Sequence, residues 1–432
     1  MNVHKEFFKY VIPSMLAFAL SGIYAIADGF FVGNALGDNA LAAVNIAYPL
    51  TAFLQAVGTG IGMGGAIEYA INMGTGNKSR GKQYFGMAIL LLVTAGILLT
   101  TLLLAGGFEI LKLFGAEGEI LKLGKEYIRF IAIGAIFQIL GTGLVPFIRN
   151  MGSAVAAMAA MIVGFVTNIA LDYTFVWVLP WGMMGAAVAT VAGQAMTFLV
   201  CLIFLIKKKE KPVFNSGDNT FFTIQKILKV GLSPFGLTYS PNLTLILINK
   251  SAALVGGAAA VTCYAPVSYI SAVVLLLIQG VSDGSQPLLS LYYGEGNREK
   301  THKIRELAYI FALIVGLCCM VSLFLGRTQI ASLFGASDSI TENVSHILPV
   351  FIVGFLFVCI SRVTTAGFYA THKNVWAYIL IYGEPAALAV FLCVLPNIFG
   401  IMGTWACVPL SQLVALVLSV FFILWETKFP IE

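Results

Sequence analysis

Charged side chains are scarce in this sequence. They make up 10% of its 432 residues, whereas hydrophobic residues make up 59%, and the mean hydropathy is +0.92. A soluble protein of this length needs far more charge to cover its surface. The composition therefore excludes a soluble enzyme and a soluble binding domain.

Catalytic motifs are also missing. The apolar runs hold neither HExxH nor paired aspartates with a Gly-Asp motif, one of which we would expect in an intramembrane enzyme. The four histidines, His4, His302, His346 and His372, lie at the ends of these runs or in loops. The seven cysteines form no CxxC pair, and we interpret them as packing residues. We predict that the protein is not an enzyme and carries no cofactor.

Long apolar runs, in contrast, are abundant. A helix needs about 20 apolar residues to cross a bilayer, and runs of that length recur from end to end. Glycine, with 44 residues, lies mostly inside them, where small residues allow helices to pack closely. We predict an all-α integral membrane protein with twelve spans, at about 8–34, 44–73, 84–107, 123–148, 154–178, 185–206, 226–250, 258–293, 305–326, 343–370, 374–396 and 403–425.

Lysine and arginine are distributed unevenly between the loops. With both termini cytoplasmic, 18 of the 25 fall in cytoplasmic segments and five in outer ones. This bias follows the positive-inside rule, so the net charge of +5 implies no nucleic-acid partner. The first apolar run is too long for a cleavable signal and lacks a cleavage site, which makes it the first helix.

The two halves of the chain resemble each other. GTGNKSRGK at 74–82 aligns with GEGNREKTH at 294–302, and LFGA recurs at 113–116 and 333–336, both at an offset of 220. Gly134 matches Gly354 at the same offset, and GMMGAAVAT at 182–190 matches GIMGTWACV at 400–408 at 218. An even number of helices in each half makes such repeats parallel, as in many transporters.

We therefore predict two pseudo-symmetric six-helix bundles. The N-terminal lobe covers 1–206 and the C-terminal lobe covers 224–432. The charged segment at 207–223 joins them as a cytoplasmic linker.

Four polar residues interrupt the first half at one depth. Asn168 and Asp172 are four residues apart and share a helix face. Asp28 and Thr190 fall at the same level when each helix rises ~1.5 Å per residue. Two carboxyls with amide and hydroxyl oxygens would share a proton or hold Na⁺. The alternative is that Asn168 and Asp172 only hydrogen-bond neighbouring helices.

The second half has different charges inside the membrane. Asp283, Arg362 and Glu384 each lie about 10 residues from the cytoplasmic end of their helix, so they share a level. They would form a salt-bridged network, or leave one carboxylate free for a cationic substrate. Glu68 lies nearer its helix end, from which it would reach the interface. Pro13 would kink the first helix, either as a hinge for the carboxylate or as a static feature.

Several motifs together resemble the multidrug and toxic compound extrusion (MATE) family, in its bacterial MepA-like branch. The resemblance covers nearly the whole chain and rests on ADGFFVGNALGDNALAAVNIAYP (27–49), GTGNKSRGK (74–82), NIALDYTF (168–175), GMMGAAVAT (182–190), GLSPFG (231–236), GVSDGSQPLLSLYYGEGN (280–297) and GIMGTW (400–405).

The resemblance implies twelve helices in two lobes and export driven by a proton or sodium gradient. It assigns the coupling-ion site of the family to Asp28, Asn168, Asp172 and Thr190, and it matches Pro13 to the family's proline in the first helix. Some relatives carry a glutamate in the seventh helix, where this chain reads TYSPNLT (238–244). Asp283 and Glu384 also depart from the family pattern.

These observations lead to one functional expectation and its alternative. We expect an antiporter in the bacterial cytoplasmic membrane, a monomer that exchanges H⁺ or Na⁺ for amphipathic, cationic small molecules by alternating access. The alternative is an exporter of a specific metabolite or a lipid-linked flippase of the same superfamily. Flippase cavities carry several cationic residues, whereas Arg362 is nearly alone here.

Overall fold

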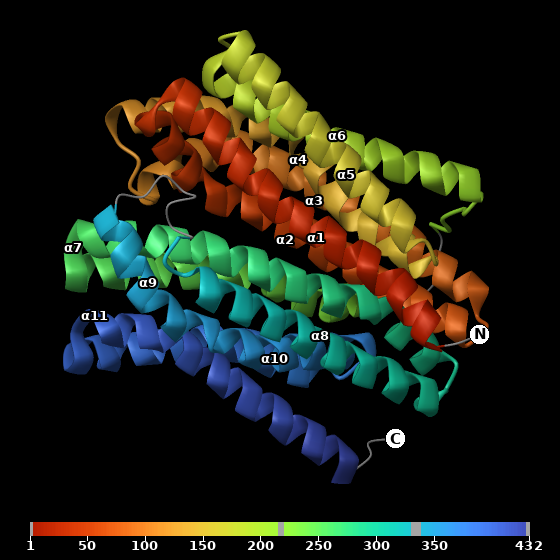
Figure 1. Ribbon diagram of the computed structural model, residues 1–432. Helices are drawn as coiled ribbons and strands as arrows, with labels where there is room; N and C mark the ends of the chain where they lie inside the picture. The colour runs from red at the N-terminus through yellow and green to blue at the C-terminus, as the bar shows by residue number, and fades with distance from the viewer. Residues whose placement is uncertain (1–2, 215–219, 330–337, 429–432) are drawn as a thin grey trace. The chain divides into compact units, whose positions relative to one another are not determined.

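The computed structural model describes residues 3–214, 220–329 and 338–428 (Figure 1). In these ranges all regular secondary structure is helical. The repeat partner LFGA at 333–336 lies outside the described residues. The helices are α1 (Val3–Leu36), α2 (Asp38–Gly74), α3 (Lys78–Leu113), α4 (Gly118–Asn150), α5 (Ala154–Asp172), the π-helix η1 (Tyr173–Val178), α6 (Gly182–Lys208), α7 (Thr220–Gly294), α8 (Arg298–Gly326), α9 (Asp338–Ile352), α10 (Gly354–Ala370) and α11 (Asn374–Lys428).

Two of these helices are each a pair of membrane spans. α7 has 75 residues and α11 has 55, whereas about 20 residues cross a bilayer. Each is broken at a glycine in the left-handed region, Gly257 (φ 66°) and Gly400 (φ 59°), where other residues are strained. Only Val353 separates α9 from α10, so they make one span, and η1 continues α5. Counted this way, the described residues hold the twelve predicted spans, and the fold class is confirmed.

The turns between helices repeat as the sequence does. Gly37 (φ 86°) corresponds to Gly257, and Gly76 (φ 82°) corresponds to Gly296 (φ 69°), both at an offset of 220. Gly182 (φ 63°) corresponds to Gly400 at 218. Because the repeated residue is a glycine held at positive φ, the duplicated sequence motifs specify duplicated turn geometry.

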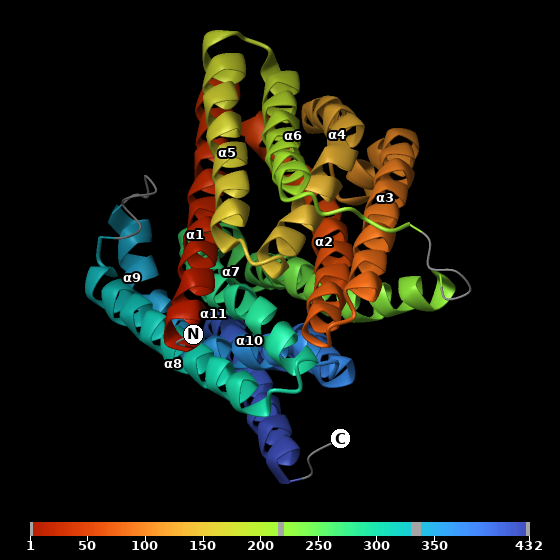
Figure 2. The same ribbon diagram turned by 90° about the vertical axis from the view of Figure 1, so that its right-hand side faces the viewer.

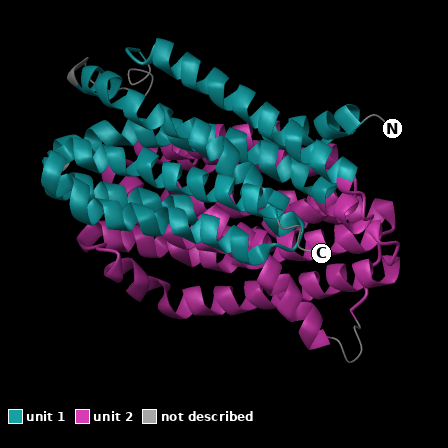
Figure 3. Ribbon diagram, turned by 90° about the horizontal axis from the view of Figure 1, so that it is seen from below, with its two compact units in different colours: residues 1–15, 240–289, 299–432 teal, residues 16–239, 290–298 magenta. Residues whose placement is uncertain are grey.

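The chain divides into two compact units (Figure 3). Unit 1 contains residues 1–15, 240–289 and 299–432, and unit 2 contains residues 16–239 and 290–298. α1 changes unit after Met15, and α7 changes unit after Tyr239 and again after Leu289. The predicted lobe boundaries at 206 and 224 stay a prediction, because the units follow helix packing and not the midpoint of the chain.

The core of unit 2 positions the polar residues of the first half. Buried apolar side chains of α2, α3, α4 and α6 form its centre, among them Leu54, Leu92, Ile139 and Ala187. α5 and α6 run side by side and are joined by the short turn around Gly182 (Figure 2). Large apolar side chains remain exposed along α3, such as Ile97 and Leu98, as expected for a surface in contact with lipid.

Candidate functional site

Aromatic contacts hold α1 against α5. The rings of Tyr24 and Phe165 stack with centroids 5.1 Å apart, and Phe30 stacks on Trp177 at 6.1 Å. These two contacts lie on either side of Asp28 along α1. The carboxyl of Asp28 is therefore kept at the surface of α5, because aromatic pairs of this kind fix the register of neighbouring helices.

Asp28 and Asp172 form a carboxyl pair. Their side chains are close enough for a hydrogen bond when one of them carries a proton, and the amide of Asn168 is within hydrogen-bonding reach of Asp172. Asp172 is fully buried and Asn168 is 2% exposed. Without an added proton or cation, both oxygens of Asp172 and Oδ1 of Asp28 have no hydrogen-bond partner. Buried polar atoms are rarely left so, which indicates that something occupies the space between the carboxyls.

Thr190 lies beside this pair on α6. α5 and α6 approach closely where Gly164 faces Gly193, since a methyl group at Gly193 would lie 2.9 Å from Cβ of Asn168. The Thr190 hydroxyl donates to the carbonyl of Ala186 at 3.1 Å. The phenols of Tyr24 and Tyr127 lie close to the Thr190 hydroxyl. The structure thus brings together Asp28, Asn168, Asp172 and Thr190.

Two members of the cluster are absent from the predicted set. Tyr24 precedes Asp28 by four residues, the spacing that also relates Asn168 to Asp172, so helix periodicity was sufficient to indicate it. Tyr127 is 5% exposed and comes from α4. Nothing in the sequence relates α4 to α1 or α5 at this depth, so Tyr127 required the structure.

A change of helix type follows the cluster. α5 ends at Asp172, and the six residues from Tyr173 to Val178 form a π-helix. π-Helical turns are rare and occur frequently at functional sites, because they free the backbone to take up a different rotation. Asp172 therefore lies where α5 can adjust the direction of its side chain.

The donor set is made of oxygen and one amide. Two carboxyls, the Asn168 carbonyl oxygen, the threonine hydroxyl and two phenols suit a shared proton or a small hard cation such as Na⁺. In the described part of the chain, three or more His, Cys, Asp or Glu residues gather nowhere in a way that would hold a transition metal.

In unit 1, Asp283 is the centre of a smaller polar cluster. It is 4% exposed and accepts hydrogen bonds from Nε2 of Gln279 at 2.6 Å and from the phenol of Tyr369 at 3.3 Å. Arg362 is 8% exposed and Glu384 is half-buried. Within the described ranges, no hydrogen bond or ion pair joins Arg362 to Asp283 or Glu384. Both expectations for these three residues, a salt-bridged network or one carboxylate left for a cationic substrate, stay predictions.

Glu68 is enclosed by the protein and paired with a lysine. It is completely buried in α2, and the ammonium of Lys226 on α7 lies 2.9 Å from its Oε2. The partner was not apparent from the sequence, because Lys226 counts there only as one of many cytoplasmic lysines.

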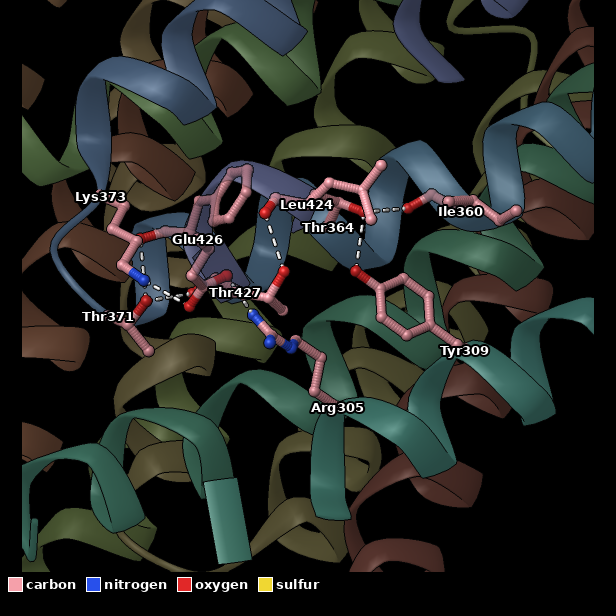
Figure 4. A network of polar contacts seen from close by, with 11 residues as sticks. Arg305, Tyr309, Ile360, Thr364, Thr371, Lys373, Leu424, Glu426 and Thr427 are labelled. Carbon is pink, nitrogen blue, oxygen red and sulfur yellow. Dashed lines mark hydrogen bonds and ion pairs between the residues drawn. The ribbon is translucent and has the colours of Figure 1, made fainter. Parts of the chain in front are cut away.

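A second ion cluster that the sequence did not indicate lies at the C-terminal end of α11 in unit 1 (Figure 4). Glu426 pairs with Arg305 of α8 at 2.8 Å and with Lys373, which precedes α11. Beside it, the hydroxyls of Tyr309 and Thr364 are 2.8 Å apart and join α8 to α10. These contacts tie three helices of unit 1 together.

Pro13 is buried in α1, two residues before the point at which the helix passes from unit 1 to unit 2. A proline removes one helical hydrogen bond, so α1 is weakened where it changes unit. Its predicted role as a hinge stays a prediction.

Comparison with known proteins identifies the family to which this fold and this cluster of polar residues belong. The MatE family matches residues 13–174 and 241–396, which together are most of the chain. The chain belongs to the MatE family. Members of this family are membrane transporters, so the protein is a MATE transporter, and that class is not enzymatic.

Full-length relatives agree with this assignment. The multidrug export protein MepA of Staphylococcus haemolyticus is 25% identical over 429 residues, which cover 98% of this chain and 93% of that protein. MepA of Staphylococcus aureus strain N315 is 23% identical, with coverage of 100% and 96%. These bacterial relatives place the protein in the cell membrane.

Solved structures share the fold. An outward-facing multidrug resistance MATE transporter of the MOP superfamily superposes with a TM-score of 0.92 at 24% identity, covering 99% of this chain and 98% of that one. A MOP superfamily transporter from Pyrococcus furiosus, described by the reverse polarity of its binding pocket, gives 0.91 at 25% identity, with coverage of 98% and 95%.

Proposed function

We propose that this MATE transporter is an antiporter that exchanges H⁺ or Na⁺ for amphipathic, cationic small molecules. The observation that carries the proposal is the Asp28–Asp172 pair, in which the buried Oδ1 of Asp28 and both oxygens of Asp172 have no hydrogen-bond partner until a proton or a cation enters. Two carboxylates in contact at low dielectric cannot both remain ionised and unpaired. The pair therefore alternates between a loaded and an unloaded form, which is what coupling to an ion gradient needs.

The helices that carry Asp28 and Asp172 support a link between ion binding at the pair and the conformation of the transporter. Asp28 is on α1, which holds Pro13 near its passage between units, and Asp172 is at the junction of α5 with a π-helix. A proton or Na⁺ shared by the two carboxyls pulls α1 and α5 together, whereas loss of the ion leaves two repelling charges. We propose that this difference drives alternating access, with Asn168 and Thr190 orienting the pair.

The proposed substrate class rests on chemistry and relatives. The MepA relatives are named as multidrug export proteins. An export cycle driven by inward H⁺ or Na⁺ suits an organic cation, because ion and substrate then compete for acidic groups.

We further propose that the transporter works as a monomer with both termini cytoplasmic, and that its lobes are 1–206 and 224–432, joined at 207–223.

One observation favours a second candidate, an exporter of a specific metabolite that carries an acidic group. Arg362 is nine-tenths buried, and it makes no hydrogen bond or ion pair within the described residues. A guanidinium is always charged and has five N–H donors, and those of Arg362 are not among the fully buried atoms without a partner, so they are accessible to an acceptor on a substrate. The structurally similar MOP superfamily transporter from Pyrococcus furiosus is described as having a binding pocket of reverse polarity that suggests a different function.

The decisive experiment is efflux with one gradient at a time. Cells or proteoliposomes containing the wild type, Asp172→Asn or the control Asp38→Asn would be loaded with a panel of fluorescent organic cations. Asp38 is an exposed acid at the start of α2, and it forms no ion pair with a described residue. If export depends on only one of the two gradients, that gradient identifies the coupling ion. Export should also be lost in Asp172→Asn and persist in Asp38→Asn. Normal export by Asp172→Asn would refute the mechanism.

A further inference from the structure

The repeated GTGN and GEGN motifs meet in unit 2. Gly74 ends α2, and Gly294 ends α7, at equivalent positions of the two repeats. A methyl group at Gly74 would overlap the carbonyl oxygen of Leu291 and lie 2.8 Å from the amide nitrogen of Glu295. A methyl group at Gly294 would overlap the carbonyl oxygen of Ile71 and lie 2.9 Å from its Cα. The two helix ends therefore touch backbone to backbone.

The contact is symmetric, because Ile71 and Leu291 are also related by the offset of 220. Each of their carbonyl oxygens already accepts a helix-terminal hydrogen bond of 2.9 Å, from Thr75 and from Glu295 respectively. The second lone pair of each oxygen faces the other repeat's glycine Cα–H. Contacts of this type are weak, so the two helix ends can separate at a small cost in free energy.

Similar contacts recur deeper along the same helices. In unit 2, a methyl group at Gly60 of α2 would lie 2.9 Å from Cβ of Phe235 on α7. In unit 1, the equivalent Gly280 of α7 faces Met15 of α1, where a methyl group would lie 2.5 Å from Cα. Met15 and Phe235 are themselves related by 220. The whole face through which one repeat meets the other thus follows the internal symmetry.

We propose that the Gly74–Gly294 contact is the cytoplasmic gate of the transporter, closed in this structure and separated when substrate enters from the cytoplasm. The proposal rests on the proposed antiport function and orientation, which place the ends of α2 and α7 at the cytoplasmic side. Glycine is required at both positions because any side chain would hold the two helix ends apart.

The ion pair between Glu68 and Lys226 lies on the same face, about two turns before Gly74 on α2. It joins α2 to the first half of α7, whereas the glycine contact joins α2 to the end of the second half. Lys226 is the seventh residue of α7, so both contacts lie toward the cytoplasmic ends of these helices, and opening of the gate would separate both.

A cross-link tests the gate directly. Thr75 and Glu295 are exposed, are equivalent in the two repeats and follow the two glycines. In a functional background without native cysteines, Thr75→Cys/Glu295→Cys should cross-link with a short thiol reagent. Efflux should then fall about tenfold or more and return on reduction, because the gate can no longer separate. The control pair Thr75→Cys/Lys78→Cys, within one repeat, should cross-link without loss of efflux.

The outcomes separate this proposal from the proposed function. A cross-linked Thr75→Cys/Glu295→Cys protein that still exports at its uncross-linked rate would overturn the gate while leaving the antiporter intact. If the wild type exports none of the cations, spin labels on the same two residues still report the gate. Their separation should then increase in part of the population on moving from acidic to alkaline pH, and a single short distance throughout would overturn the proposal.

Alanine substitutions provide a second, independent measurement. Gly74→Ala and Gly294→Ala should each lengthen the label distance and reduce efflux about tenfold, since the added methyl meets backbone that cannot yield cheaply. Gly106→Ala in α3 is the matched control, because no atom lies within 4 Å of the position of its methyl group. Unchanged distances in Gly74→Ala and Gly294→Ala would show that the contact plays no part in closure.

Discussion

The ammonium of Lys226 lies 2.9 Å from Oε2 of Glu68, a carboxylate that is completely buried, whereas the lysine side chain keeps 31% of its surface exposed. The pair is therefore asymmetric. Removing Lys226 leaves the buried carboxylate of Glu68 without its ion-pair partner. Removing the charge of Glu68 leaves a lysine that still reaches water and the ring of Tyr84.

This asymmetry predicts unequal losses of stability. Lys226→Met should lower the free energy of unfolding by about 3 kcal/mol, and Glu68→Gln should lower it less. The double variant should recover part of the loss of Lys226→Met, because no unpaired carboxylate remains. Thermal unfolding in detergent micelles measures the order.

Lys112→Met is the control, since Lys112 pairs with Glu109 at an exposed site and its loss should cost less than ~1 kcal/mol. Equal losses for Lys226→Met and Lys112→Met would contradict the buried-pair interpretation.

Thr190→Val should slow coupled export without unfolding the protein. The substitution keeps the shape of the side chain but removes the hydroxyl oxygen beside the carboxyl pair, near the phenols of Tyr24 and Tyr127. We expect a decrease of about tenfold in gradient-driven efflux, the equivalent of one lost buried hydrogen bond or two. Thr94→Val is the control, because Thr94 is hydrogen-bonded only to Leu90 of its own helix. A wild-type rate for Thr190→Val would remove Thr190 from the proposed site.

The sequence was informative wherever a property repeats along one helix or between the two repeats. The spacing of Asn168 and Asp172, the depth of Asp28 and Thr190, and the duplicated glycine motifs follow from helix rise and periodicity alone. The span 8–34 is found as Val3–Leu36, because helix ends extend beyond the apolar core into caps and turns.

What the sequence did not indicate are contacts between residues on different helices. Tyr127 reaches Thr190 from α4, and Glu426 meets Arg305 from α8, 121 residues away. Neither pair has a spacing that marks it. Glu68 was expected at the interface by its distance from the helix end, but packing of α2 against α7 buries it.

The ion cluster at Glu426 predicts a stability effect confined to unit 1. Glu426→Gln removes the charge that Arg305 and Lys373 share, so the end of α11 loses its contact with α8 (Figure 4). We expect a loss of about 2 kcal/mol and faster proteolysis at the C-terminal end, because hydrogen bonds to charged groups contribute more than neutral ones. The matched change is Glu306→Gln, whose partner Lys303 is 43% exposed and whose loss should be barely measurable. Comparable unfolding temperatures for these two variants would count against the cluster as a structural tie.

Arg362 distinguishes the two candidate functions. If Arg362 binds an acidic group of the substrate, Arg362→Gln should reduce export of substrates that carry a carboxylate by tenfold or more. A factor of ten corresponds to about 1.4 kcal/mol of binding free energy. Export of purely cationic substrates should be unchanged. Arg362→Lys should restore charge but not the planar fork of donors, and should therefore recover only part of the loss. Paired efflux assays with a zwitterionic dye and its methyl ester measure the difference. Arg327→Gln is the control, since Arg327 is half-buried just after the end of α8 and donates to the carbonyl of Phe324. Equal losses for the zwitterion and the ester in Arg362→Gln would mean that Arg362 maintains the fold of α10, and the metabolite candidate would then lose the observation that favours it.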